Sequence, residues 1–296
     1  MFLALGLLVV GLVGAMLLAV GAASRPSATA PVSSAPATAP VSRPANSYPP
    51  AKLARACRTA STKMLARLDR TFRAVVRPPF VVIGNLPAAR LEQIAAGSVV
   101  RPAQAMWRSY FRRRPTDVIT VLLFRDGKSY RRWAKKLFAD TDVPHFGYYR
   151  QSNRTMVMDI ATGTGTLVHE LTHALIAYDF PAVPDWFNEG LGSLHEQCYV
   201  RPDGIVGAVN WRLPALQKAI RDGQLRPLAD LLTRKDFYGT QRGMNYAQGR
   251  YFVMYMQKRK LLRKFYRSFH ARAGRDAVKA VEEVFDRDLK QIEPDF

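Results

Sequence analysis

Residues 169–173 read His-Glu-Leu-Thr-His. On a helix, positions i and i+4 lie one above the other on the same face, so His169 and His173 can both reach one metal ion. Glu170 lies beside them, where a carboxylate can activate a water molecule. This stretch therefore predicts one half of a catalytic site for a single Zn²⁺ ion, with Glu170 as its general base.

The residues around the motif predict the helix that it requires. The segment 166–178 contains no Pro or Gly, and its apolar residues recur at helical spacing: Leu167, Leu171, Ala174, Leu175 and Tyr178. Thr166 is expected as the N-cap, because Gly163 and Gly165 interrupt the chain just before it. A core helix with two incidental histidines is the alternative, and the glutamate at the required position disfavours it.

A catalytic zinc ion takes three protein ligands and keeps one position for water. Residues 184–194 read Pro-Asp-Trp-Phe-Asn-Glu-Gly-Leu-Gly-Ser-Leu, and a helix beginning near Asp185 would carry Glu189 in its second turn. This segment resembles the gluzincin metallopeptidases, in which a second helix supplies a glutamate ligand. Its Trp-Phe-Asn-Glu-Gly is similar to the Trp-x-x-Glu-Gly of the aminopeptidase N and peptidase MA-like groups. The resemblance implies Glu189 as the third ligand, with Asp185 as a weaker alternative.

Two further comparisons of motifs refine this resemblance. The residues that follow His173 lack the glycine and third histidine of metzincins. His195 and Glu196 are expected at the surface or behind the ligands. Residues 246–249 read Tyr-Ala-Gln-Gly, similar to the Tyr-x-Lys-Gly of aminopeptidase N relatives, in which the tyrosine stabilises the oxyanion. The resemblance implies that role for Tyr246, with Tyr251 as a fallback, although Gln248 replaces the family's lysine.

The order of predicted elements also resembles the thermolysin-like and peptidase MA-like fold. The resemblance implies an α+β zincin domain, in which a small mixed sheet lobe precedes a mainly helical lobe. It also implies that residues 155–160 form a sheet edge that binds an extended peptide. The predicted elements are a helix over 51–76, a strand over 80–84, mainly helix over 86–112, a strand over 117–124, a helix over 128–139, a hairpin of 147–150 and 154–160, and helices from 166 onward.

These features favour a zinc-dependent peptidase that acts on peptide or protein substrates. The chain lacks the Gly-Ala-Met-Glu-Asn segment and the large N-terminal β domain of aminopeptidase N, so an endopeptidase or processing enzyme is expected. Two alternatives stay open. One is a membrane-tethered binding or scaffolding domain whose zinc has no catalytic role. The other is a zinc amidase that acts on a cell-wall crosslink, because water activation is the same chemistry.

The N-terminal part of the chain predicts targeting to a membrane. Residues 1–23 contain no charged or polar side chain, which suits a signal peptide or a transmembrane helix. Residues 24–50 are rich in Pro, Ala, Ser and Thr, and are expected to form a disordered linker. Residues 51–296 have a suitable size for one metallopeptidase domain. The domain is expected outside the cytoplasm, either membrane-anchored or secreted.

Charge and cysteine content bear on partners. The formal net charge is +21, which reflects either solvated helix faces or attraction to anionic lipid or an anionic cell-wall polymer. No recognition motif accompanies the charge, so a specific nucleic-acid partner is not expected. The chain has two cysteines, Cys57 and Cys198. They would form a disulfide in an exported domain or remain two structural thiols.

Overall fold

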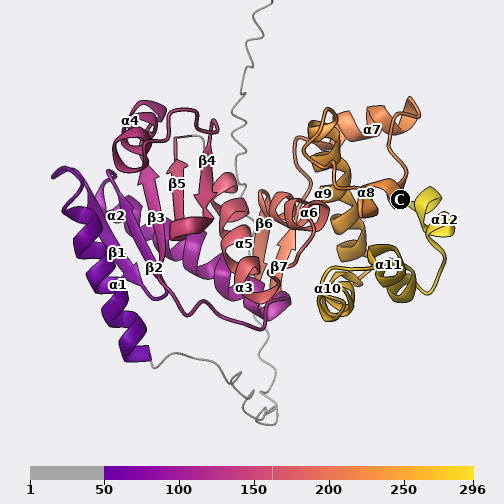
Figure 1. The fold of residues 1–296 in the computed structure, drawn as a ribbon, viewed down its shortest axis with the longest axis horizontal. Helices are drawn as coiled ribbons and strands as arrows, with labels where there is room; N and C mark the ends of the chain where they lie inside the picture. Colours follow the sequence, from indigo (N-terminus) through magenta and orange to yellow (C-terminus); the bar gives the residue numbers. More distant parts are fainter. Residues whose placement is uncertain (1–49, 162) are drawn as a thin grey trace, which may run out of the picture. The chain divides into compact units, whose positions relative to one another are not determined.

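A five-stranded mixed sheet organises the N-terminal half of the domain in the computed structural model, which describes residues 50–161 and 163–296. The strands stand in the order β1-β2-β3-β5-β4 (Figure 1). The inner pairs β2–β3 and β3–β5 are parallel, whereas β1 and β4 add antiparallel edges. The strands are β1 (Arg73–Arg77), β2 (Phe80–Gly84), β3 (Ile119–Phe124), β4 (Gly147–Arg150) and β5 (Thr155–Asp159).

Helices cover both faces of this sheet, as its hydrophobic inner strands require. In β2, Val81 and Ile83 point to one cluster of buried side chains, and Phe80 and Val82 point to another. The first cluster lies under α1 (Pro50–Leu65) and α4 (Gly127–Phe138). The second lies under α2 (Ala88–Ile94), a π-helical turn (Ala95–Val100), α3 (Arg101–Ser109) and α5 (Gly165–Asp179).

The C-terminal half is mainly helical and continues from α5 (Figure 1). The helix α6 (Asp185–His195) packs on both α5 and α9 (Arg242–Lys258). Between them the chain forms the hairpin β6–β7 and two short helices. The remaining elements are β6 (Cys198–Arg201), β7 (Gly204–Gly207), α7 (Leu213–Arg221), α8 (Leu228–Thr233), α10 (Leu262–Ala271), α11 (Ala277–Phe285) and α12 (Leu289–Ile292). The domain thus mixes helices with a small sheet, and its sheet lobe precedes a mainly helical lobe, as predicted.

Two predicted elements need correction. The expected helix over 51–76 ends at Leu65, and residues 73–77 form β1 instead. Their β-branched residues suit a strand, and β2 offers them an edge to pair with. The expectation of helix from 166 onward was wrong for 198–207, where β6 and β7 form a hairpin. Gly204 has φ +155°, and a Cβ there would lie 2.0 Å from the Ser109 hydroxyl, so the turn packs tightly against α3.

The expected sheet edge at residues 155–160 was also wrong. The strand β5 pairs with β3 on one side and with β4 on the other, so it lies inside the sheet. The edge on that side is β4, the first strand of the β4–β5 hairpin, which lies outside β5 in the strand order. The N-cap of α5 is Thr164 rather than Thr166, and the helix begins at Gly165.

Cys57 and Cys198 are both free thiols, so the structure favours two structural thiols over a disulfide.

Within residues 50–161 and 163–296, no helix has the length and apolar character that a membrane span needs. The predicted targeting segment 1–23 and residues 24–49 of the predicted linker lie outside the described residues.

Candidate metal centre

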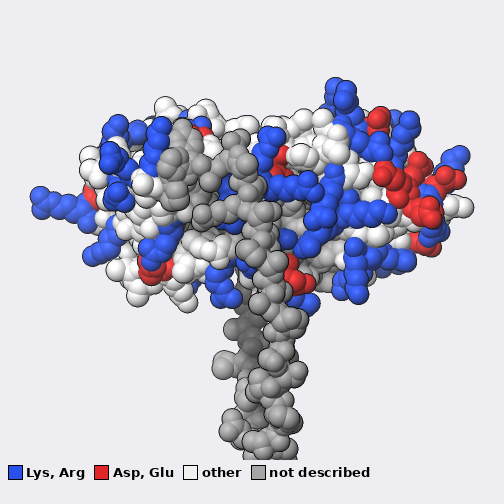
Figure 2. Space-filling model, turned by 90° about the horizontal axis from the view of Figure 1, so that it is seen from below, with Lys and Arg blue, Asp and Glu red and all other residues white. Residues whose placement is uncertain are grey.

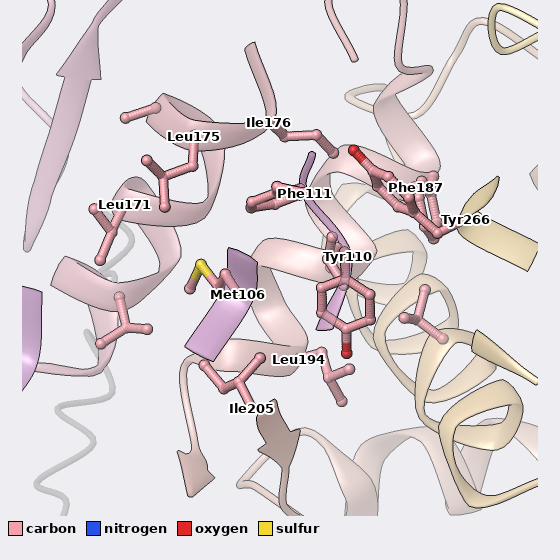
Figure 3. Close-up of a cluster of buried hydrophobic side chains, with 14 of the residues drawn as sticks. Met106, Tyr110, Phe111, Leu171, Leu175, Ile176, Phe187, Leu194, Ile205 and Tyr266 are labelled. Atoms are coloured by element: carbon pink, nitrogen blue, oxygen red, sulfur yellow. The ribbon is translucent and has the colours of Figure 1, made fainter. Parts of the chain in front are cut away.

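The motif helix α5 is anchored by its apolar face. Leu171, Leu175 and Ile176 are buried, and they face Met106 of α3 and Phe111, which follows that helix (Figure 3). Leu167 and Ala174 are fully buried too, and Tyr178 is partly buried, so the predicted apolar stripe is confirmed except at its last residue. This packing fixes the rotation of α5 and turns its histidine face toward α6.

A glycine allows α6 to approach the two histidines closely. A Cβ at Gly192 would lie 3.1 Å from Nε2 of His169 and 3.1 Å from Cε1 of His173. Any larger residue would displace an imidazole ring. Glu189 lies almost one turn earlier on the same helix, so the close approach of α6 also brings its carboxylate to the rings.

Three predicted ligands converge at this crossing. His169, His173 and Glu189 each offer one ligand atom, and the three atoms lie within 4.8 Å of one another. Oε2 of Glu189 is 3.1 Å from Nε2 of His169 and 3.4 Å from Nε2 of His173. The side chains of the three residues are at most 14% exposed. This buried group could hold a metal ion. Asp185, the weaker alternative, is exposed and outside the group.

The other ring nitrogen of each histidine, Nδ1, is hydrogen-bonded to a neighbouring side chain, as is usual for histidines that bind a metal. Nδ1 of His169 donates to Oε1 of Glu196 at 3.1 Å, and Nδ1 of His173 donates to Oδ1 of Asn188 at 2.8 Å. Both acceptors hold a proton on Nδ1, so Nε2, the nitrogen that faces Glu189, is the one that a metal ion would bind. Burial would lower the pKa of His169, but its hydrogen bonds with Glu189 and Glu196 raise it to about 10, so a divalent cation must displace the Nε2 proton when it binds.

Glu196 is itself fixed by further polar groups. Arg212 forms an ion pair with its Oε2, and Nδ2 of Asn210 donates to the same oxygen at 3.1 Å. Burial would raise the pKa of Glu196, but the contacts with His169 and Arg212 outweigh it and hold the pKa below its usual value. Glu196 is therefore an anion that supports a ligand, in agreement with the predicted location behind the ligands.

The charges of the site act on its carboxylates in opposite directions. Burial raises the pKa of Glu170, only partly offset by the neighbouring His173 and His169. Burial also acts on Glu189, but hydrogen bonds with the two histidines win and hold its pKa well below the usual value. Glu189 is thus an anion that could serve as a metal ligand, while Glu170 is a carboxylate with a stronger affinity for a proton.

Two tyrosines lie beside the ligands. The Tyr246 ring stacks on the His169 ring, with centroids 6.4 Å apart and an interplanar angle of 25°. Burial and the charge of Glu189 raise the pKa of Tyr246, so its hydroxyl stays protonated. Tyr238 was not predicted, yet its hydroxyl donates to Oε1 of Glu189 at 2.7 Å. It lies between α8 and α9, where no sequence motif marks it.

Other residues named from the sequence lie away from the ligands. His195 is completely buried, its Nδ1 lies 3.0 Å from the Thr172 hydroxyl, and burial lowers its pKa to about 3. It is a neutral core residue and not a surface group. Gln248 donates to the carbonyl of Arg226 at 2.8 Å. Tyr251, the fallback for Tyr246, binds the backbone of Asn210 instead.

A cleft of about 820 Å³ runs beside the centre. Glu196 and Arg212 form part of its wall, so the network behind His169 is continuous with it. Three of the exposed large hydrophobic side chains of the described residues also line it, namely Phe146, Tyr199 and Trp211.

Comparisons with known proteins add no assignment, since no protein-family model matches the chain and no curated protein matches it either.

Proposed function

We propose that this protein is a zinc-dependent peptidase of the gluzincin type. The observation that carries the proposal is the convergence of His169, His173 and Glu189 within 4.8 Å, with Glu170 in the same helix turn. Two nitrogen ligands and one carboxylate match the donor set of catalytic zinc sites. The order of a sheet lobe, a histidine helix and a glutamate helix supports a thermolysin-like zincin fold.

Glu170 is the proposed general base. When bound, Zn²⁺ would supply Lewis-acid activation of water and of the scissile carbonyl. Glu170 would accept a proton from the attacking water and deliver it to the leaving amine. The raised pKa that burial gives this carboxyl supports both steps, because a base with a pKa nearer neutrality also returns the proton readily.

Tyr246 is the proposed donor to the carbonyl oxygen as negative charge develops there. Its stacking on His169 places the phenol beside the ligands, and its raised pKa keeps the proton available. Tyr238 is a second hydroxyl in reach of the same region, held on Glu189.

The edge strand β4 supports an extended peptide as substrate. β4 borders the site, because a hydrogen bond with the backbone of Tyr149 on β4 acts to lower the pKa of the Glu170 carboxyl. A peptide added to this free edge would lie along the metal centre, its backbone paired with β4. An accessible edge of this kind suits an endopeptidase or processing enzyme.

The proposed setting of this domain is outside the cytoplasm, tethered or secreted. It rests on the uncharged apolar residues 1–23 and the Pro-rich stretch that follows them. The proposed partners besides the substrate are the membrane and an anionic lipid or cell-wall polymer.

Glu170→Gln tests the catalytic part of the proposal. The variant should bind zinc as the wild type does, because Glu170 is not among the ligands, yet its peptide hydrolysis should fall at least about a hundredfold. Metal analysis and cleavage of a peptide library measure the two properties. A Glu170→Gln protein of undiminished activity would remove Glu170 from its role.

His173→Ala tests the metal part of the proposal, and its expected result is loss of bound zinc, which metal analysis measures.

Incubating the wild type with a peptide library and a peptidoglycan digest, each with and without a chelator, separates the peptidase from the two alternative functions. Chelator-sensitive cleavage of peptides supports the peptidase. Cleavage confined to the digest would indicate an amidase, and bound zinc without turnover would indicate a binding domain.

A further inference from the structure

A second feature of the centre is Arg242, an arginine that pairs with no carboxylate of the residues that the structure describes. Arg242 begins α9, and its guanidinium carbon lies 5.7 Å from the ring centroids of both Tyr238 and Tyr246. Burial raises the pKa of the Tyr246 hydroxyl, and a hydrogen bond with Arg242 opposes this effect. The cation therefore lies beside both tyrosines of the site, and one of them, Tyr238, donates directly to Glu189.

Nearby arginines are neutralised by carboxylates of the chain. Arg212 pairs with Glu196, Arg226 pairs with Asp236, and Arg234 pairs with Asp230. Among the described residues, no carboxylate pairs with Arg242, whose side chain is exposed. The position of this charge is nevertheless restrained, because two aromatic rings face the guanidinium.

We infer that Arg242 selects substrates that carry a carboxylate close to the scissile bond. This inference rests on the proposed peptidase function. A guanidinium offers two parallel N–H donors to a carboxylate, and the pair is stronger where aromatic rings exclude part of the water. The carboxylate could be the C-terminus of a peptide or the side chain of Asp or Glu.

The position of Arg242 gives the pairing a catalytic consequence. A substrate carboxylate held there would bring the neighbouring peptide bond toward Tyr246 and the ligands. Binding energy from a group outside the reacting bond then orients that bond. The Arg242 charge thus favours cleavage of acidic peptides over their neutral counterparts.

Matched peptides test the inference in the zinc-loaded full-length protein. The first series is a pair of peptides that differ only in a free or amidated C-terminus. In the second series, each position of a phenylalanine-containing pentapeptide carries Glu in one peptide and Gln in its matched counterpart. The wild type should show a kcat/KM at least about tenfold higher for the acidic member of one series, which also identifies the source of the carboxylate. Arg242→Gln should reduce this preference to within about twofold, and Arg242→Lys should retain part of it.

Arg221→Gln is the matched control. Arg221 is an exposed arginine in the last turn of α7, so this variant carries the same charge change without touching the site. It should keep both the activity and the preference for acidic peptides. Loss of the preference in Arg221→Gln would assign it to overall charge and would overturn the inference.

A binding measurement separates failure of this inference from failure of the proposed function. Saturation-transfer NMR on the metal-free full-length protein compares the same acidic and neutral peptides without turnover. Stronger binding of the acidic peptides that disappears in Arg242→Gln supports the inference even if no peptide is hydrolysed. Equal cleavage of acidic and neutral peptides by the wild type would overturn it while the peptidase function stands.

Discussion

At the scale of single residues, the centre depends on which nitrogen of each histidine is free. Glu196 and Asn188 accept from the two Nδ1 atoms, and this leaves both Nε2 atoms directed at Glu189. The two histidines could be named from the sequence because their spacing is set by one helix turn, and Glu189 was implied by the resemblance of its segment to the gluzincins. Asn188 could not be named, since it is an unmarked neighbour of Glu189, and Glu196 could be named only as a residue at the surface or behind the ligands.

Glu196→Gln should weaken zinc binding about 10- to 100-fold, the usual cost of losing a group that orients a ligand. The neutral amide can present its NH₂ to Nδ1 of His169 and so favour the wrong tautomer, and it also loses the ion pair with Arg212. Competition with a chromophoric chelator measures the affinity. Glu92→Gln, on the exposed surface of α2, is the control and should bind zinc normally. Unchanged affinity in Glu196→Gln would contradict the supporting role.

Gly192→Ala should also lower zinc affinity, through space and not through charge. The new methyl group would lie 3.1 Å from Nε2 of His169 and must displace a ring. Gly243→Ala is the control, because no atom lies within 4 Å of the Cβ it adds. The same chelator competition should show at least a tenfold loss for Gly192→Ala only. Normal zinc binding by Gly192→Ala would show that the helices can separate without cost.

At the scale of elements, prediction succeeded where a pattern was long and local. The helix predicted over 166–178 and the strand predicted over 117–124 carry continuous apolar signals, and both are present, as Gly165–Asp179 and Ile119–Phe124. The short strands β1, β6 and β7 were missed, because each is stabilised by its pairing partner more than by its own residues. The edge was misplaced for a related reason, since strand order is set by tertiary packing.

The contact between α6 and α9 is tight enough to test by substitution. A Cβ at Gly190 would lie 2.9 Å from the carbonyl oxygen of Gly249 and 3.0 Å from Val253. Gly190→Ala should therefore destabilise the domain by about 1–3 kcal/mol, in spite of the better helix propensity of alanine. Urea unfolding measures the change, and Gly243→Ala should be neutral or slightly stabilising. An equally stable Gly190→Ala protein would mean that α9 can move away.

At the scale of the whole molecule, the face shown in Figure 2 carries basic side chains over most of its width, and its largest group of acidic side chains lies at one end. Four basic residues form a basic face across α3, β6 and the start of α10. Arg263 donates to the carbonyl of Arg108, Arg108 donates to the carbonyl of Arg201, and Lys260 lines the same small pocket as Arg263. Such a surface attracts anionic headgroups or polymers.

Residues 50–296 alone should bind vesicles that contain phosphatidylglycerol and release them as salt rises to about 0.5 M, because the attraction is screened. The double change Arg108→Glu and Arg201→Glu should weaken binding at least about tenfold. Arg55→Glu with Lys63→Glu, on α1 across the sheet, is the control. Co-sedimentation measures each case. Equal binding to neutral phosphatidylcholine vesicles would contradict an electrostatic contact.

The close contact between Gly190 and Gly249 has a consequence for biosynthesis. Glu189 is held in place by a helix that follows it by about fifty residues in the sequence, although both histidines come before it. A ribosome-bound chain that has not yet released α9 therefore has its histidine pair without the support that positions the third ligand. We therefore expect the complete ligand set to form late, after α9 emerges, so that the proposed activity would be withheld from neighbouring chains until synthesis is nearly complete.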